Sequence, residues 1–192
     1  KYGRGLICLA LNQFQVNKLN LSLMSPINNS RTQTAFTVSI DAKKGITTGI
    51  SAQDRAFTIK TAIKKNVSKK DIESPGHVFP LVSKNGGVLV RAGHTEASVD
   101  VSKLSKCGTS GVICEIMNDD GTMARVKELR KVAEKHDLVM ITIADLIKYR
   151  IRNDKLVKRV ADAELPTEQG LFHVHAYESV IDGETHVALV RG

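Results

Sequence analysis

The sequence predicts an α/β (α+β) fold, in which a mixed sheet with βαβ units and flanking helices is followed by a C-terminal β-hairpin. Short apolar runs of strand length alternate with amphipathic runs of helical length. A strand, a helix and a second strand between residues 87 and 116 have the spacing of a βαβ unit. Two alternating runs, 172–177 and 185–190, flank Asp182-Gly183, which suits a tight turn.

The first third of the chain is predicted to hold two strands and a helix. Residues 7–11 are a continuous apolar run, which favours a buried strand, and residues 35–41 alternate and are rich in β-formers. Ser51 and Asp54 resemble a capping box with Asp in place of Glu. They predict a helix that ends near residue 64.

The middle of the chain is predicted to hold the βαβ unit. Pro75-Gly76 predicts a turn, and residues 78–81 predict a short extended segment with an edge-type proline. Residues 87–91 predict a buried strand, the residues after Gly93 predict a helix, and residues 111–116 predict a second apolar strand. We expect these two strands to be parallel, with a right-handed crossover.

A helix, a strand and a short helix are predicted to follow a turn at residues 118–122. The first helix carries Met123, Val126, Leu129 and Ala133 on one face. The remaining two elements are a buried strand at 138–143 and a helix at 144–150.

The composition is typical of a globular protein, with 42% hydrophobic and 25% charged residues. No apolar run reaches the roughly 20 residues that a membrane helix needs, so no membrane partner is expected. The start of the chain has no signal-peptide pattern. Cys8, Cys107 and Cys114 lack C-x-x-C spacing, which favours a reducing compartment and a cytoplasmic protein.

The net charge of +8 leaves a second hypothesis open, that of a non-catalytic basic module that binds nucleic acid or another polyanion. Lys64, Lys65, Lys69 and Lys70 cluster near a predicted helix end. Aromatic residues make up only 4% of the chain and there is no tryptophan, so bases have few side chains to stack on. We therefore expect no nucleic-acid partner and keep the basic module as the alternative.

A polar cluster stands where a predicted strand gives way to a helix: Arg91, Gly93, His94 and Thr95. A helix N-terminus favours anions, an arginine beside it suits phosphate, and a histidine can bind a metal or move a proton. Glu115 is a carboxylate in an apolar run, which needs a partner or a purpose. The predicted parallel order brings Glu115 to the same sheet edge. The cluster therefore predicts acid–base chemistry on a phosphorylated carbonyl compound.

Structural alternatives stay open for these residues. His94 could cap its helix, and Arg91 could be a surface charge at a strand end. His77, in a loop before an extended segment, could be a further acid or base, or a structural histidine. A metal site on the C-terminal hairpin is a weaker hypothesis, because strand positions commonly carry histidine. The histidines of that hairpin are His173, His175 and His186.

Four runs of the sequence resemble the 3,4-dihydroxy-2-butanone 4-phosphate synthase family. They are residues 34–42, 75–81, 91–97 and 114–125. The resemblance covers roughly residues 1 to 150 in order. The tail from Leu165 looks like the start of GTP cyclohydrolase II, and the two in this order resemble the bifunctional riboflavin-biosynthesis enzymes.

The resemblance implies conversion of D-ribulose 5-phosphate to L-3,4-dihydroxy-2-butanone 4-phosphate and formate with Mg²⁺ or Mn²⁺. It implies His77 and Glu115 as catalytic residues, His94 as a metal ligand, and Cys8 as a cysteine near the site. The implied substrate-binding residues are Arg91, Ala92, Gly93, His94, Thr95 and Glu115. The family is homodimeric with its site at the interface, so His77 would serve the neighbouring subunit. Zn²⁺ is expected only for the remainder of the cyclohydrolase domain.

The family's first strand and its acidic loop, which supplies a metal-binding glutamate, have no match here. We therefore expect residues 1–152 to be an N-terminally truncated synthase domain, with little or no synthase activity in the chain as given. We expect residues 153–164 to be a linker, or a strand leading out of the domain, and residues 165–192 to be the start of a truncated GTP cyclohydrolase II domain.

Overall fold

The computed structural model describes residues 2–191. The chain divides into two compact units, one ending at Ile143 and the other beginning at Ala144, and each is described by itself. None of the helices in this described part of the chain has the length and apolarity to span a bilayer.

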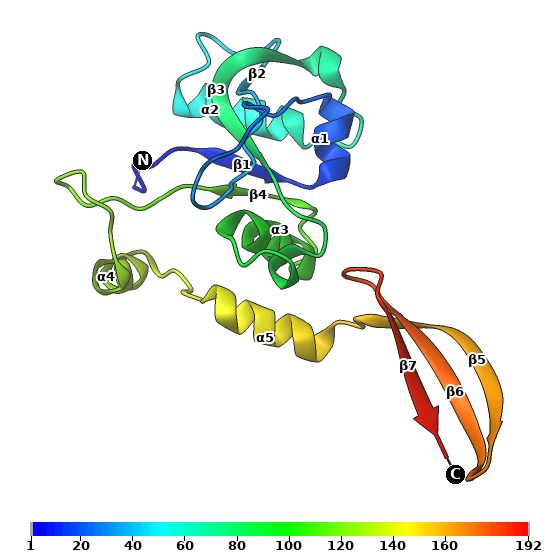
Figure 1. Cartoon of the computed structure of the whole chain (residues 1–192). Coiled ribbons are helices and arrows are strands. Elements are labelled where there is room, and N and C mark those ends of the chain that lie inside the picture. The colour runs from blue at the N-terminus through cyan, green and yellow to red at the C-terminus, as the bar shows by residue number, and fades with distance from the viewer. Residues whose placement is uncertain (1, 192) are drawn as a thin grey trace. The chain divides into compact units, whose positions relative to one another are not determined.

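The first unit is built on a four-stranded mixed sheet with the order β2-β3-β1-β4 (Figure 1). Its strands are β1 (Cys8–Leu11), β2 (Ile40–Ala42), β3 (Ile72–Val82) and β4 (Ser110–Ile113). β1 and β3 are parallel, whereas β2 pairs antiparallel with β3 and β4 pairs antiparallel with β1. The predicted mixed sheet is therefore confirmed.

Three of the four α-helices of this part of the chain lie against the sheet (Figure 1). The helices are α1 (Gln13–Leu19), α2 (Ala52–Ala62), α3 (His94–Leu104) and α4 (Val126–His136). α1 and α2 lie on one side, while α3 lies on the other and packs against β1 and β4. Ser51 caps α2 as predicted, because its side chain accepts the N–H of Asp54 at 3.0 Å. The core gathers apolar residues of β1, α1, β2, α2 and β3, including Leu9, Leu19, Ile40 and Val78.

The predicted strand at 87–91 is wrong, and so is the parallel unit built on it. Gly87–Leu89 is a short 3₁₀ helix, and Gly86 and Gly87 both have positive φ, at 87° and 64°. The buried Asp100 accepts the N–H of Val88 at 2.8 Å, which holds this turn against α3. The apolar run at 87–91 gives no sign of this hydrogen bond between Val88 and Asp100. The only parallel pairing among the described strands joins β1 to β3.

The predicted turn at Pro75-Gly76 is also wrong, because both residues lie inside β3. Pro80 is not on a sheet edge either, since β3 lies between β2 and β1. The N–H of Phe79 donates to the carbonyl of Ile7, just before β1, and proline at position 80 has no N–H to donate. The carbonyl of Pro80 accepts the N–H of Thr37 at 3.0 Å.

Two further strand predictions need correction. Of residues 35–41, only Ile40 and Asp41 belong to β2, while Phe36 and Thr37 form isolated bridges. Residues 138–142 form no strand, and Val139 is 92% exposed. An apolar run therefore did not predict burial at 138–142.

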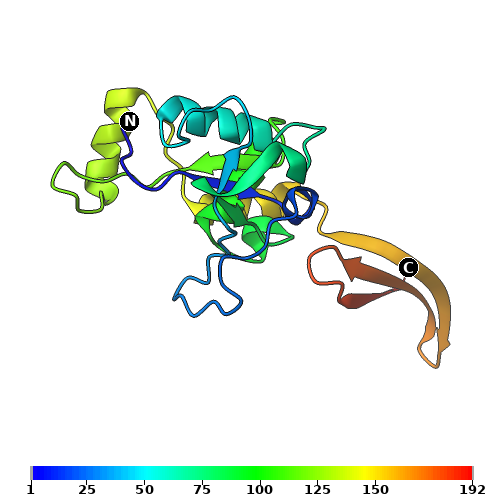
Figure 2. The same ribbon diagram turned by 90° about the horizontal axis from the view of Figure 1, so that it is seen from above.

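The second unit is a three-stranded antiparallel sheet in the order β5-β6-β7, preceded by a helix. Its elements are α5 (Ile143–Asn153), β5 (Val157–Thr167), β6 (Gly170–Ser179) and β7 (Thr185–Val190). The predicted hairpin is confirmed as β6 and β7, with Gly183 at φ 75° in its turn (Figure 2). The segment at 153–164 was expected to be a linker or a strand leading out, and from Val157 onward it is the third strand of this sheet.

Candidate active site

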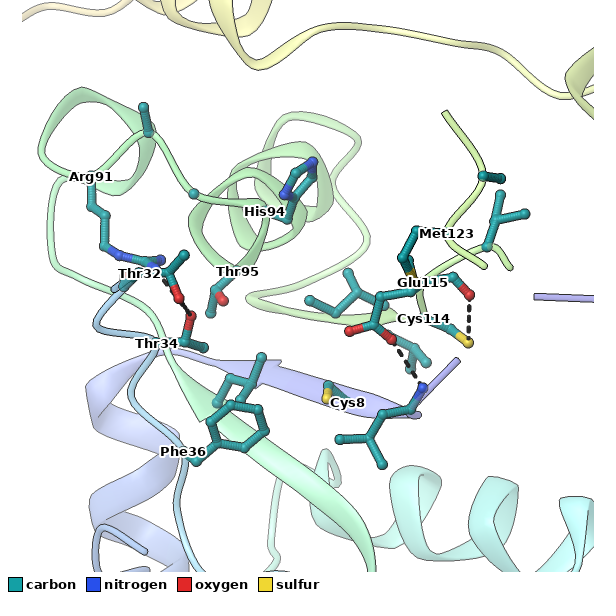
Figure 3. Close-up of a pocket in the computed structure, with 18 of the residues that line it drawn as sticks. Cys8, Thr32, Thr34, Phe36, Arg91, His94, Thr95, Cys114, Glu115 and Met123 are labelled. Carbon is teal, nitrogen blue, oxygen red and sulfur yellow. Dashed lines mark hydrogen bonds between the residues drawn. The ribbon is translucent and has the colours of Figure 1, made fainter. Parts of the chain in front are cut away.

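A pocket of about 1040 Å³ opens on the first unit between the start of α3, the start of β1 and the residues around the end of β4 (Figure 3). Arg91 and Thr95 lie on one side of it, and Glu115 and Cys114 lie on the other. The pocket therefore brings together the predicted substrate-binding residues. These are Arg91, Ala92, Gly93, His94, Thr95 and Glu115.

α3 presents its N-terminus to this pocket without a side-chain cap. Gly93 is the N-cap, and its φ of −115° and ψ of 154° are extended. His94 is the first residue of the helix, so the alternative that it caps the helix is wrong. Its side chain is exposed and has no hydrogen bond to the described residues. The N–H groups of the first turn, together with the helix dipole, suit an anion here.

Arg91 is held in the pocket wall. One guanidinium nitrogen lies 2.5 Å from a carboxylate oxygen of Glu96, and the other donates to the carbonyl of Thr32 at 2.7 Å and to the hydroxyl of Thr34 at 3.2 Å. The alternative of a free surface charge is therefore wrong. Arg91 ties the segment at 32–34 to the start of α3, with its positive charge beside the pocket.

Glu96 is the residue that organises this wall, and sequence reasoning missed it. Its side chain is fully buried, and it accepts the N–H of Lys84 at 3.0 Å besides pairing with Arg91. Gly93 leaves room for this pair, because a Cβ there would lie 2.2 Å from Arg91 Nη1 and 2.6 Å from Glu96 Oε2. The available signal was a carboxylate in the first turn of a helix, five residues after an arginine.

Glu115 lies just after β4 and is exposed to the pocket, rather than buried inside a strand. Its Oε2 accepts the N–H of Leu6 at 2.9 Å, while its own carbonyl accepts the N–H of Gly5 at 3.2 Å. Gly5 permits this approach, since a Cβ there would come within 2.5 Å of Glu115 Oε2. The predicted neighbourhood of Glu115 and His94 is found, but it arises from α3 packing on β4 and not from parallel strands.

Cys8 lines the same pocket from β1. Burial, together with the nearby Glu115 carboxylate and Cys114, raises the pKa of the Cys8 thiol to about 11. The thiol is therefore neutral at physiological pH. A neutral thiol is a poor nucleophile and a poor proton acceptor, so Cys8 is not the base of this pocket.

The raised pKa predicts slow alkylation of Cys8. Its thiolate fraction at pH 8 should be roughly 100-fold below that of a thiol with the ordinary pKa, since two pKa units separate them. Iodoacetamide labelling followed by mass spectrometry should modify the exposed Cys107 first, and the Cys8 rate should climb until about pH 11. The substitution Glu115→Gln should speed Cys8 labelling. Equal rates for Cys8 and Cys107 at pH 8 would contradict the buried, neutral thiol.

His77 is the predicted site residue that the structure places outside this pocket. It lies on β3 and not in a loop, and its Nδ1 is 2.7 Å from Oδ2 of Asp41 on β2. Its side chain is 40% exposed.

The described residues contain no group of three His, Cys, Asp or Glu side chains arranged to hold a metal ion. On the second unit, the His175 ring contacts Asp162 and Arg159, and His186 pairs across the strands with Tyr177. The hairpin metal site is therefore not supported between residues 2 and 191. At the pocket, His94 is a candidate metal ligand, but it does not belong to a group of three such side chains among the described residues.

Comparison with protein families gives two matches along the chain. The 3,4-dihydroxy-2-butanone 4-phosphate synthase model matches residues 1–149, and the GTP cyclohydrolase II model matches residues 158–192. The riboflavin biosynthesis protein RibBA of Aquifex aeolicus (strain VF5) is 57% identical over 194 residues, which is 100% of this chain and 48% of that protein. The chain thus spans about half the length of the curated relatives it matches.

Solved structures agree with the sequence comparison. RibBX, a two-domain 3,4-dihydroxy-2-butanone 4-phosphate synthase from A. baumannii, superposes with a TM-score of 0.86 at 45% identity, covering 100% of this chain and 56% of that one. A 3,4-dihydroxy-2-butanone 4-phosphate synthase in complex with two magnesium ions gives a TM-score of 0.76 at 35% identity, covering 80% of this chain and 76% of that one.

Proposed function

Because this chain belongs to the 3,4-dihydroxy-2-butanone 4-phosphate synthase family, we propose that it converts D-ribulose 5-phosphate to L-3,4-dihydroxy-2-butanone 4-phosphate and formate in riboflavin biosynthesis. The GTP cyclohydrolase II match at 158–192 supports a second, cyclohydrolase activity in a bifunctional protein of the RibBA kind. The proposed domains are the synthase over 1–152, with the cyclohydrolase beginning at 165. The three free cysteines support a cytoplasmic location.

The observation that carries this proposal is the single pocket that joins residues 91–95 to Glu115. The uncapped N-terminus of α3 and the positive charge of Arg91 suit the phosphate of the substrate. A sugar phosphate of five carbons is smaller than a pocket of about 1040 Å³, which leaves room for water and a partner side chain.

Glu115 is the proposed base that takes the proton from the carbon next to the carbonyl. Its Oε2 is oriented by the N–H of Leu6, and its Oε1 has no hydrogen bond to the described residues. The reaction then needs loss of water, a carbon shift and hydrolytic release of formate. The five-carbon substrate thus yields a four-carbon product and formate. The reaction also needs a general acid that donates a proton to the leaving hydroxyl.

His77 is the proposed acid–base partner of Glu115, and it acts in the pocket of a second subunit. Its place outside the pocket of its own chain and its 40% exposed side chain support this arrangement. The proposed active form is accordingly a homodimer with the site at the interface.

Mg²⁺ or Mn²⁺ is the proposed cofactor, supported by the related structure that contains two magnesium ions. The described residues do not form a complete site for either metal ion, because His94 is not grouped with two further His, Cys, Asp or Glu side chains. Magnesium prefers oxygen ligands and keeps several waters, so His94 by itself does not hold it. The roles of Glu115 and His77 above therefore do not depend on a metal geometry.

The activity is tested by formate release from D-ribulose 5-phosphate with Mg²⁺, before and after EDTA, in a full-length protein that carries these residues and in this chain by itself. We expect turnover in the longer protein, loss with EDTA and recovery with excess Mg²⁺. D-ribose 5-phosphate, which has the same charge but no ketone at carbon 2, is the matched control and should release no formate. Absence of formate from the longer protein would overturn the proposal.

A further inference from the structure

Asp41 holds His77 at two points. Its Oδ1 accepts the backbone N–H of His77 at 3.1 Å, and its Oδ2 lies 2.7 Å from His77 Nδ1. Asp41 is only 5% exposed, so its carboxylate has little access to water. The pairing of β2 and β3 shifts register between Ile40, which lies opposite Val78, and Asp41, which lies opposite Glu73.

The loop before α2 closes against this pair. Gly49 has a φ of 91°, and a Cβ there would lie 2.2 Å from Asp41 Oδ2 and 2.6 Å from His77 Nδ1. Asp54 anchors the loop, because it accepts the hydroxyl of Thr47 at 2.6 Å and the N–H groups of Thr47 and Gly49 at 3.2 and 3.1 Å. These bonds, that of the Thr47 hydroxyl first, hold the pKa of Asp54 below its usual range.

We propose that Asp41 is a positioning residue for His77, which fixes a proton on Nδ1 and leaves Nε2 to exchange protons with the substrate. Oδ1 of Asp41 is already occupied by a backbone N–H, so Oδ2 is the oxygen that faces the ring. A carboxylate is an acceptor only, so the ring is the donor in the contact between Nδ1 and Oδ2. The proposal rests on the proposed function for the substrate, but the state of the ring is a property of this chain.

The state of the ring is measured directly by NMR of ¹⁵N-histidine in the 192-residue chain. The His77 signals are assigned by their loss in His77→Gln. We expect the Nδ1–H tautomer when the ring is neutral. In Asp41→Asn the amide can donate to Nδ1, so the tautomer should change to Nε2–H. An unchanged tautomer in Asp41→Asn would overturn the proposal.

Kinetics add a readout that a purely structural residue would not give. In the full-length protein, Asp41→Asn should lower kcat about 10²- to 10⁴-fold and leave KM within a few-fold. The reason is that Nε2 of His77 already carries a hydrogen in the Nε2–H tautomer and cannot accept a proton from the substrate. A normal kcat with a changed tautomer would overturn the role in positioning. If the unsubstituted protein releases no formate, the proposed function fails, and the NMR result still decides whether Asp41 sets the state of His77.

Two glycine variants supply matched controls. Gly49→Ala puts a methyl group against the Asp41–His77 pair, whereas Gly183→Ala puts one at a similar φ of 75° with no atom within 4 Å. Both carry the backbone strain of a positive φ. We expect only Gly49→Ala to disturb the His77 signals and lower kcat. Equal effects of the two variants would contradict a contact between this loop and the pair.

Discussion

Replacing Glu115 with glutamine is expected to reduce formate release by about 10²- to 10⁴-fold, because the amide cannot accept the substrate proton. The fold should survive, since the glutamine oxygen can still accept the N–H of Leu6 that Glu115 Oε2 accepts at 2.9 Å. The measurement is kcat for formate with a full-length protein, beside its thermal midpoint.

Glu128→Gln is the matched control. Glu128 also accepts a backbone N–H, that of Arg125 at 2.9 Å, but it lies in the first turn of α4 and does not line the pocket. The two variants make the same chemical change, so only Glu115→Gln should lose turnover. Retained turnover in Glu115→Gln would mean that the base lies elsewhere.

His94→Ala should likewise abolish activity, and a normal rate would remove His94 from the site.

Replacing Glu96 with alanine is expected to destabilise the first unit by about 3–5 kcal/mol, since it leaves a partly buried guanidinium without its partner. Glu96 is fully buried. Its Oε2 lies 2.5 Å from Nη1 of Arg91, and its Oε1 accepts the N–H of Lys84 at 3.0 Å. Losing it should also free the segment at Thr32 and Thr34, which Arg91 holds beside the pocket. Chemical denaturation gives the free energy of unfolding.

The control for this prediction is an exposed ion pair. Arg4 pairs with Asp119, and the two side chains are 50% and 92% exposed. Asp119→Ala should cost less than about 1 kcal/mol, as exposed pairs usually do. Equal costs for Glu96→Ala and Asp119→Ala would contradict the central place given to Glu96 in the pocket wall.

The sequence predicted the neighbourhood of the site better than its architecture. His94 and Thr95 were expected at a helix start and are found there, because Gly93 ends an extended stretch and α3 follows at once. Glu115 was expected near them through a parallel βαβ unit. It is near them through α3 and an antiparallel β4, so the location was right and the reason was wrong.

The errors arise where tertiary contacts override local patterns. The apolar run at 87–91 is a turn because two glycines take positive φ and Asp100, 12 residues after Val88, accepts the N–H of Val88. The bonds from Arg91 to Glu96 and from His77 to Asp41 were not visible, since their partners lie 5 and 36 residues away and follow no motif. The apolar run at 138–142 was expected in a strand, and the unit that ends at Ile143 does not bury it.

The central claim is that the pocket between α3 and Glu115 takes a sugar phosphate. Isothermal titration of D-ribulose 5-phosphate into the 192-residue chain with Mg²⁺ tests it most directly, beside a titration with duplex DNA and a repeat with His94→Ala. We predict saturable binding of the sugar phosphate, loss of that binding in His94→Ala, and no saturable binding of DNA at physiological salt. Salt-sensitive binding of DNA with no binding of the sugar phosphate would contradict the account and favour the basic polyanion-binding module.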